Sequence, residues 1–187
     1  MDAFEQLVGN LLESEGYWVK RSVKVVLTKE DKARIGRKSS PRWEIDVVAY
    51  HVTQNRLLVI ECKSYLDSGG VHAAHFDAGS RYAHRYKLFH EPVLRETVLA
   101  RLKQQCVADG GCRVDADIAL GLAYGHTTAH NDALIRDHFS TNGWLLFGPD
   151  WLHTHLQRMA TGSYENSMAA IVAKLLLRSP GPLCEPA

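Results

Sequence analysis

Residues 43–65, with the sequence WEIDVVAYHVTQNRLLVIECKSY, predict the centre of the fold. Residues 43–52 are rich in β-branched and aromatic side chains, and residues 57–65 begin with an apolar run. Gln54 and Asn55 between them are typical turn residues. We therefore expect two neighbouring strands joined by a short turn, and the uninterrupted apolar residues 58–60 predict that the second strand is central and buried.

The segments on either side of this pair predict one α/β domain. Before it, residues 2–15 carry apolar side chains at helical spacing, residues 17–27 are typical of a strand interrupted by charge, and residues 28–41 predict a loop. After it, the expected elements are helical structure over 73–108, strongest over 91–108, a strand over 117–124, a short helix over 131–140, a strand over 144–147 and closing helices over 149–158 and 164–177. Residues 1–178 then form a single domain, and residues 179–187 are expected to be a mobile tail.

The composition is that of an ordinary globular protein. The chain has 187 residues, of which 45% are hydrophobic and 23% charged, which argues against disordered, collagen-like and coiled-coil proteins. A membrane protein is not expected, because no apolar run approaches the roughly 20 residues that span a bilayer. We expect a cytoplasmic protein, since the N-terminus lacks a secretory signal pattern and the four cysteines show no CxxC or zinc-finger spacing.

The formal net charge of +1 hides an uneven distribution. Between Lys20 and Arg42 the sequence has nine basic residues and only Glu30 and Asp31 as acids. A positive field of this kind suits a nucleic-acid phosphate backbone. A solvated hairpin explains the same charges equally well.

Side chains in a strand alternate between its two faces, so residues two apart share a face. In the strand over 43–52, this alternation places Glu44 and Asp46 on one face and Ile45 and Val47 on the other.

The same alternation places Glu61 and Lys63 on one face of the next strand, with Ile60 and Cys62 on the other. Pairing of the strands through the short turn brings Asp46 close to Glu61 and Lys63.

Carboxylates in half-buried strands cost free energy unless a cation compensates them. A divalent metal held by Asp46 and Glu61 would provide that compensation, and oxygen ligands favour magnesium or manganese. Lys63 would then orient the attacking water, help to deprotonate it, or stabilise charge on a phosphate. The alternative is a metal-free surface ion network of these three residues with Glu44.

Asp46, followed on the next strand by Glu61-Cys62-Lys63, resembles the PD-(D/E)xK nuclease superfamily, which has the restriction-endonuclease-like fold. The resemblance implies an αβββαβ core with a central mixed sheet flanked by helices, and residues 4–124 match this order. It also implies that an acid of the first helix joins the metal site. Glu5 occupies that place, although an acid there is also typical of a helix N-terminus. The chain departs from the family pattern in having Ile45, instead of proline, before the first acid.

The resemblance implies a magnesium-dependent DNA endonuclease that hydrolyses phosphodiester bonds, with manganese able to substitute. Asp46, Glu61 and Glu5 would bind the metal, and Lys63 would complete the catalytic set. The basic residues expected to contact DNA phosphates are Lys29, Lys32, Arg34, Arg37, Lys38 and Arg42. The resemblance leans toward methylation-dependent restriction enzymes and archaeal-type Holliday-junction resolvases, which work as homodimers. The apolar helix over 164–177 suits such a dimer, or packs on the sheet.

Three other interpretations remain open at this point. The chain is a non-catalytic DNA-binding or assembly subunit on the same fold, or a metal-free interaction domain in which the acids form surface ion pairs. The third is a zinc site formed by His72, His75, Asp77 and His84, although their spacing equally suits a loop that enters a helix.

Overall fold

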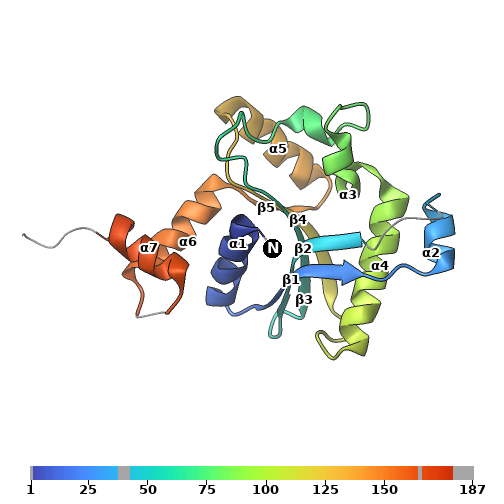
Figure 1. Ribbon diagram of the computed structural model, residues 1–187, viewed down its shortest axis with the longest axis horizontal. Helices are drawn as coiled ribbons and strands as arrows, with labels where there is room; N and C mark the ends of the chain where they lie inside the picture. The colour runs from blue at the N-terminus through green and yellow to red at the C-terminus, as the bar shows by residue number, and fades with distance from the viewer. Residues whose placement is uncertain (1, 38–42, 164–165, 179–187) are drawn as a thin grey trace, which may run out of the picture.

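A computed structural model describes residues 2–37, 43–163 and 166–178 and shows a mixed α/β fold built on a five-stranded sheet (Figure 1). The strands follow one another across the sheet in chain order, β1-β2-β3-β4-β5. Their bounds are Trp18–Val25 (β1), Trp43–His51 (β2), Arg56–Lys63 (β3), Asp117–Tyr124 (β4) and Leu145–Phe147 (β5). The first three strands pair antiparallel, and β3, β4 and β5 pair parallel. The predicted central position of the second strand of the pair is confirmed, because it is β3.

Helices cover both faces of the sheet (Figure 1). Their bounds are Ala3–Ser14 (α1), Lys29–Arg34 (α2), Lys87–His90 (α3), Pro92–Ala108 (α4), Ala129–Thr141 (α5), Pro149–Thr161 (α6) and Met168–Leu177 (α7), with 3-10 turns at Ala73–Phe76 (η1) and Ala83–Arg85 (η2). Apolar residues of α1, α6 and α7 form one core layer, and those of α3, α4 and α5 form the other. Residues 57–60 of β3 are all buried because the two layers enclose this strand. No helix within the described ranges is long and apolar enough to cross a membrane.

Several predicted elements differ from the structure. Residues 28–37 are not all loop, since the Thr28 side chain and Asp31 form a capping box that starts α2. The helical signal between residues 73 and 90 corresponds to two 3-10 turns and the short α3 instead of a continuous helix. The last helix begins at Met168, where Ser167 caps it. The tail expected over 179–187 lies outside the described residues.

The alternation of side chains in β2 breaks at Asp46. Ile45 belongs to the core layer of α4, whereas Val47 belongs to the layer of α1, so the prediction that these two residues share a face is wrong. The pairing of β1 with β2 passes over Ser22, which has a φ of 52°. This left-handed conformation is incompatible with a regular strand, and the sheet is therefore distorted where Ser22 lies opposite Asp46.

The directions of the strands bring several chain segments to one end of the sheet. Since β3 is antiparallel to β2 and parallel to β4, Lys63, Trp43 and Tyr124 lie at the same end, which we call the Lys63 end. The segment that follows β3 leaves the sheet there. So does the segment that follows β1, residues 28–37, which contains α2 and which we call the α2 segment. Charged residues of these segments can therefore act on one site.

Candidate functional site

Asp46, Glu61 and Lys63 come together near the Lys63 end of the sheet. Lys63 Nζ lies 3.5 Å from Glu61 Oε2 and 3.9 Å from Asp46 Oδ2. The side chains are largely enclosed: Asp46 is 22% exposed, Glu61 is 14% exposed and Lys63 is 18% exposed. The ion pairs thus exist, but they lie in a largely enclosed position, and Glu44, the fourth member of the predicted surface network, is exposed instead.

A backbone hydrogen bond fixes the Asp46 carboxylate. The pairing of β2 with β3 begins only at Val47 and Ile60, and the N–H group of Cys62 donates to Asp46 Oδ2 at 2.7 Å. The side chain thus takes the place of a strand carbonyl as acceptor at the distorted point of the sheet. Burial raises the pKa of Asp46, although the Lys63 charge and this hydrogen bond oppose the increase.

Glu61 is the more strongly perturbed of the two acids. Its Oε1 atom is buried and has no hydrogen-bond partner among the described residues. Burial raises its pKa to about 7, with a further contribution from the charges of Asp46 and Glu5, while Lys63 opposes the increase. Carboxyl groups whose pKa is shifted by burial and by a specific charged partner are candidates for a functional site.

Lys63 remains charged in this environment. Burial by itself would lower the pKa of Lys63, but the carboxylates of Glu61 and Asp46 outweigh burial and raise it. Its ammonium group also lies 6.0 Å from the centre of the Tyr86 ring. A lysine held in this way stabilises negative charge and does not act as a base at neutral pH.

Glu5 lies at the edge of this cluster. It stands in the first turn of α1, its Oε2 accepts a 3.4 Å hydrogen bond from Ser22 Oγ, and its charge contributes to the pKa shift of Glu61. In the described part of the chain, however, no group of three or more His, Cys, Asp or Glu residues is placed to hold a metal ion. The structure therefore brings two of the three predicted ligands together and leaves Glu5 beside them.

The two close carboxylates still fit a magnesium ion. Magnesium in proteins is commonly held by one or two carboxylates together with water and substrate phosphates. Glu61 Oε1, which has no partner among the described residues, is an oxygen that a cation could bind. A cation would also offset the free-energy cost of ionising the two buried acids.

The predicted DNA contacts of the α2 segment are only partly available. Arg37 donates to both carboxylate oxygens of Glu91, at 2.8 and 2.7 Å, and Arg34 lies 3.3 Å from Glu96. Lys29 and Lys32 make no ion pair with a described residue, and Lys29 is exposed.

Asp31 adds a third link between α2 and α4 through an ion pair of 2.8 Å with Arg101. The α2 segment is thus fastened to α4, which neutralises part of the predicted positive field. Lys38 and Arg42, the other two predicted contacts, lie outside the described residues.

The residues considered for zinc have other partners. The backbone N–H of His72 donates to His75 Nδ1 at 3.3 Å, and the His72 ring lies within hydrogen-bond distance of the Asn131 amide. His84 is exposed and contacts the carbonyl of Arg81. The described residues thus do not assemble the zinc site.

Sequence reasoning missed the cationic and aromatic residues around these histidines. Tyr65, Arg81, Tyr82 and Arg85 line a cavity next to the end of β3, together with His72 and His75. The available signal was the interleaving of basic and aromatic residues in the sequence RYAHRY, residues 81–86.

Two comparisons with known proteins give no match. Neither a family model nor a curated protein matches the chain. The assignment of the site therefore rests on its own residues and geometry.

Proposed function

We propose that the chain is a metal-dependent DNA endonuclease that hydrolyses phosphodiester bonds on a restriction-endonuclease-like core. The observation that carries this proposal is the enclosed cluster of Asp46, Glu61 and Lys63, in which one carboxylate oxygen of Glu61 is buried and has no partner in the part of the chain that the structure describes. The element order supports it, because α1, β1, β2, β3, α4 and β4 follow one another as in the αβββαβ core that the resemblance implies, with the short helices α2 and α3 and two 3-10 turns inserted between them.

The residues of the cluster divide the work. Asp46 and Glu61 would hold a magnesium ion, which would polarise the scissile phosphate and lower the pKa of an attacking water. The Cys62 N–H fixes Asp46, so this ligand is already oriented before substrate binds. Lys63 presents a permanent positive charge to the phosphate oxygens on which negative charge develops.

The second candidate is a non-catalytic DNA-binding or assembly subunit on the same fold. The observation that favours it is that Lys63 already pairs with both acids, so the cluster is partly compensated without a metal. This candidate predicts DNA binding that does not depend on a divalent cation.

A cleavage assay separates the two candidates. Supercoiled plasmid and a labelled four-way junction are incubated with the protein in magnesium, manganese or EDTA. We expect cleavage in either metal and none in EDTA. Asp46→Asn, which keeps the size of the side chain, should reduce the rate at least about 100-fold, since it removes charge from the metal site.

The matched control is Asp137→Asn, which neutralises an exposed acid of α5 and should cleave like the unmodified protein. Cleavage in EDTA, or equal rates for the two variants, would overturn the nuclease assignment. Salt-sensitive DNA binding without cleavage in either metal would establish the non-catalytic subunit instead.

A further inference from the structure

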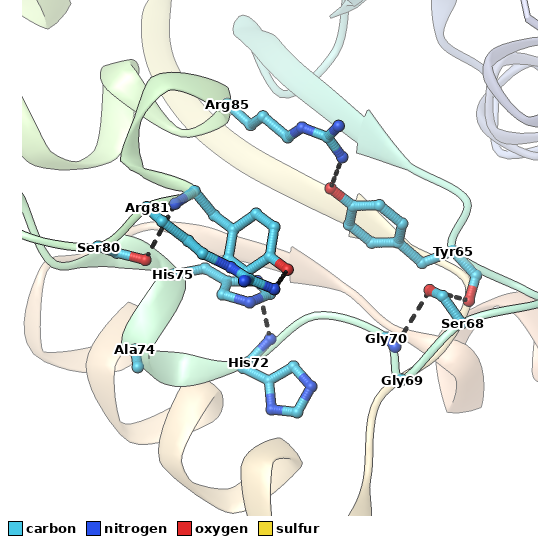
Figure 2. A pocket seen from close by; sticks show the side chains of 11 residues that line it. Tyr65, Ser68, Gly69, Gly70, His72, Ala74, His75, Ser80, Arg81 and Arg85 are labelled. Atoms are coloured by element: carbon cyan, nitrogen blue, oxygen red, sulfur yellow. Dashed lines mark hydrogen bonds between the residues drawn. The ribbon is translucent and has the colours of Figure 1, made fainter.

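A cavity of about 780 Å³ lies in the segment that follows β3, and Figure 2 shows the side chains that line it. It is lined by 11 residues of the segment between Tyr65 and Arg85, which follows directly after Lys63. Tyr86, the next residue along the chain, lies within 6.0 Å of the Lys63 ammonium group. Tyr65, which lines the cavity, stands two residues after Lys63 and feels the Lys63 charge, so a molecule in the cavity would be close to the Asp46–Glu61–Lys63 cluster.

The lining of the cavity is positively charged. None of its 11 residues is Asp or Glu, whereas Arg81, Arg85, His72 and His75 all belong to it (Figure 2). Within the described ranges, neither arginine makes an ion pair, in contrast to Arg37 of the α2 segment. The pKa of His75 is lowered first by burial and then by its neighbours, the charged Arg81 and Arg85 among them, so both arginines act on the space beside the His75 ring.

Aromatic rings form the other part of the lining. The Arg81 guanidinium lies over the Tyr82 ring at 4.5 Å, and the His75 ring is 4.5 Å from the same ring. Arg85 Nη1 donates to the Tyr65 hydroxyl at 3.0 Å (Figure 2). The arginines are thus held by tyrosines, which leaves their charge uncancelled.

The floor of the cavity is held in place by the loop that follows β4. Val71 N–H donates to the His126 carbonyl at 2.9 Å, and Thr127 Oγ1 donates to the Val71 carbonyl at 2.7 Å. Gly70 has a φ of 81°, and a Cβ atom there would lie 2.4 Å from the His126 oxygen. The close approach of these two loops requires glycine and gives the cavity a formed floor before any ligand binds.

We propose that this cavity binds one unpaired nucleotide of the DNA substrate, with its phosphate on Arg81 and Arg85 and its base against Tyr82 and Tyr65. Uncompensated guanidinium groups recognise phosphate, and aromatic faces stack on any base. The volume far exceeds that of a phosphate ion and lies in the range of small-molecule pockets. A base pair within a duplex cannot enter such a cavity, so the nucleotide must be unpaired. This inference rests on the proposed function in that it names the substrate class of the same site.

The test measures binding in EDTA, so that it does not depend on cleavage. The probes are a fluorescently labelled single strand, the same sequence as a blunt duplex, and a duplex with a single-stranded overhang, each followed by anisotropy at fixed salt. We expect the single strand and the overhang to bind at least about tenfold more tightly than the blunt duplex.

Three variants test whether the cavity is responsible for the tighter binding of unpaired DNA. The double variant Arg81→Gln and Arg85→Gln, and separately Tyr82→Leu, should weaken binding of the overhang about tenfold and change binding of the blunt duplex less than about twofold. Tyr82→Phe keeps the aromatic face but removes the hydroxyl that accepts from Arg81, so it should retain more binding than Tyr82→Leu. Arg113→Gln, which changes an exposed arginine outside the cavity, is the matched control, and melting temperatures confirm that each variant is folded.

Each other outcome has a definite meaning. Equal binding of overhang and blunt duplex, or unchanged binding by the cavity variants, would overturn the inference. Competition by deoxynucleoside monophosphate at the concentration at which the overhang saturates would show that a free nucleotide is the ligand, and would overturn the DNA assignment of the cavity. Cavity-dependent binding without cleavage in magnesium would support the inference while the nuclease proposal failed. Magnesium-dependent cleavage with unchanged binding by the cavity variants would show the reverse.

Discussion

The Glu61 carboxyl group combines an enclosed position, an unpartnered oxygen and two neighbouring acids. Its pKa of about 7 in the folded protein lies above the ordinary value of a glutamate. Between these two values, the folded state binds more protons at this residue than the unfolded state does. The contribution of Glu61 to stability is therefore present at pH 4 to 5 and is lost as the pH rises toward 7.

The first prediction concerns Glu61→Gln in the absence of divalent cations. Because glutamine cannot ionise, the variant should lose this part of the pH dependence, and its melting temperature should exceed that of the unmodified protein at pH 8 by more than at pH 5. Thermal unfolding at both pH values in EDTA measures the difference. A constant difference between the two proteins across this range would contradict the raised pKa. Added magnesium should narrow the gap at pH 8, since it stabilises only the ionised glutamate.

The short turn between the two strands was sufficient to predict that Asp46, Glu61 and Lys63 would lie together, because it sets the register of β2 and β3 even though the alternation of faces breaks at Asp46. It was not sufficient to predict how Asp46 is held. The hydrogen bond from Cys62 N–H depends on the interruption of strand pairing at this residue, and a regular alternation of faces contains no signal for it. The catalytic and metal-binding roles of these residues remain predictions.

At the scale of single elements, the distortion of β1 is the least expected feature. Ser22 adopts a left-handed backbone conformation that costs a residue with a side chain about 1–2 kcal/mol, and most of all a β-branched one. Ser22→Val should therefore lower the free energy of unfolding by about 1–2 kcal/mol relative to Ser22→Gly. Denaturant unfolding of the two variants provides the measurement.

Substitution by valine at Lys20 or Lys24, which are exposed on the same strand, controls for the change in side chain. Valine there should be tolerated, because these residues pair regularly with β2. Equal stability of Ser22→Val and Ser22→Gly would mean that β1 relaxes to a regular strand without cost. The sequence predicted this strand with an interruption caused by its charged residues. The structure shows instead that the interruption is the left-handed backbone at Ser22.

The α2 segment leads to a prediction about salt dependence. Lys29 is exposed, whereas Arg37 is held by both oxygens of Glu91. If the segment contacts DNA, Lys29→Ala should reduce the slope of log affinity against log salt by about 0.9, the value for one phosphate contact. Arg37→Ala should change this slope less and should lower stability by about 1 kcal/mol, as expected for a bidentate ion pair. Binding measured at several salt concentrations checks both values, and identical slopes for the two variants would refute the distinction.

At the scale of the whole molecule, α7 presents an apolar surface. Its small residues Ala170 and Ala173 are buried, and the helix packs on α6. The sheet therefore does not cover the large apolar side chains of α7. Met168, Leu175 and Leu176 are 72%, 77% and 76% exposed. Such a cluster of exposed apolar side chains is typical of an interface.

We therefore expect the protein to form a homodimer through α7. Light scattering coupled to size-exclusion chromatography should give about twice the mass of 20.9 kDa at micromolar concentration. The double variant Leu175→Ser and Leu176→Ser should give the mass of one chain at an unchanged melting temperature. A monomeric unmodified protein, or a dimer that persists in the variant, would exclude α7 as the interface.

The molecule as a whole follows the predicted α/β class, because long apolar runs and helical spacing determine which faces are buried. Prediction from the sequence failed where contacts distant along the chain decide the outcome. The contact of α2 with α4 and the cavity after β3 both depend on residues far apart in the sequence. Examples are the ion pair of Arg37 with Glu91 and the backbone hydrogen bond from Val71 N–H to the His126 carbonyl.

Because the Cys62 N–H donates to the Asp46 carboxylate, the exchange rate of this amide proton depends on where that carboxylate lies. Most protected amide protons in a sheet exchange with solvent when strands separate, but this one depends on the carboxylate of a single acid. Its hydrogen-exchange rate would thus report the state of the site without substrate, metal or turnover. In a variant that does not cleave DNA, fast exchange of this amide would show that the Asp46 carboxylate has moved away. Slow exchange would show that the carboxylate is still in place.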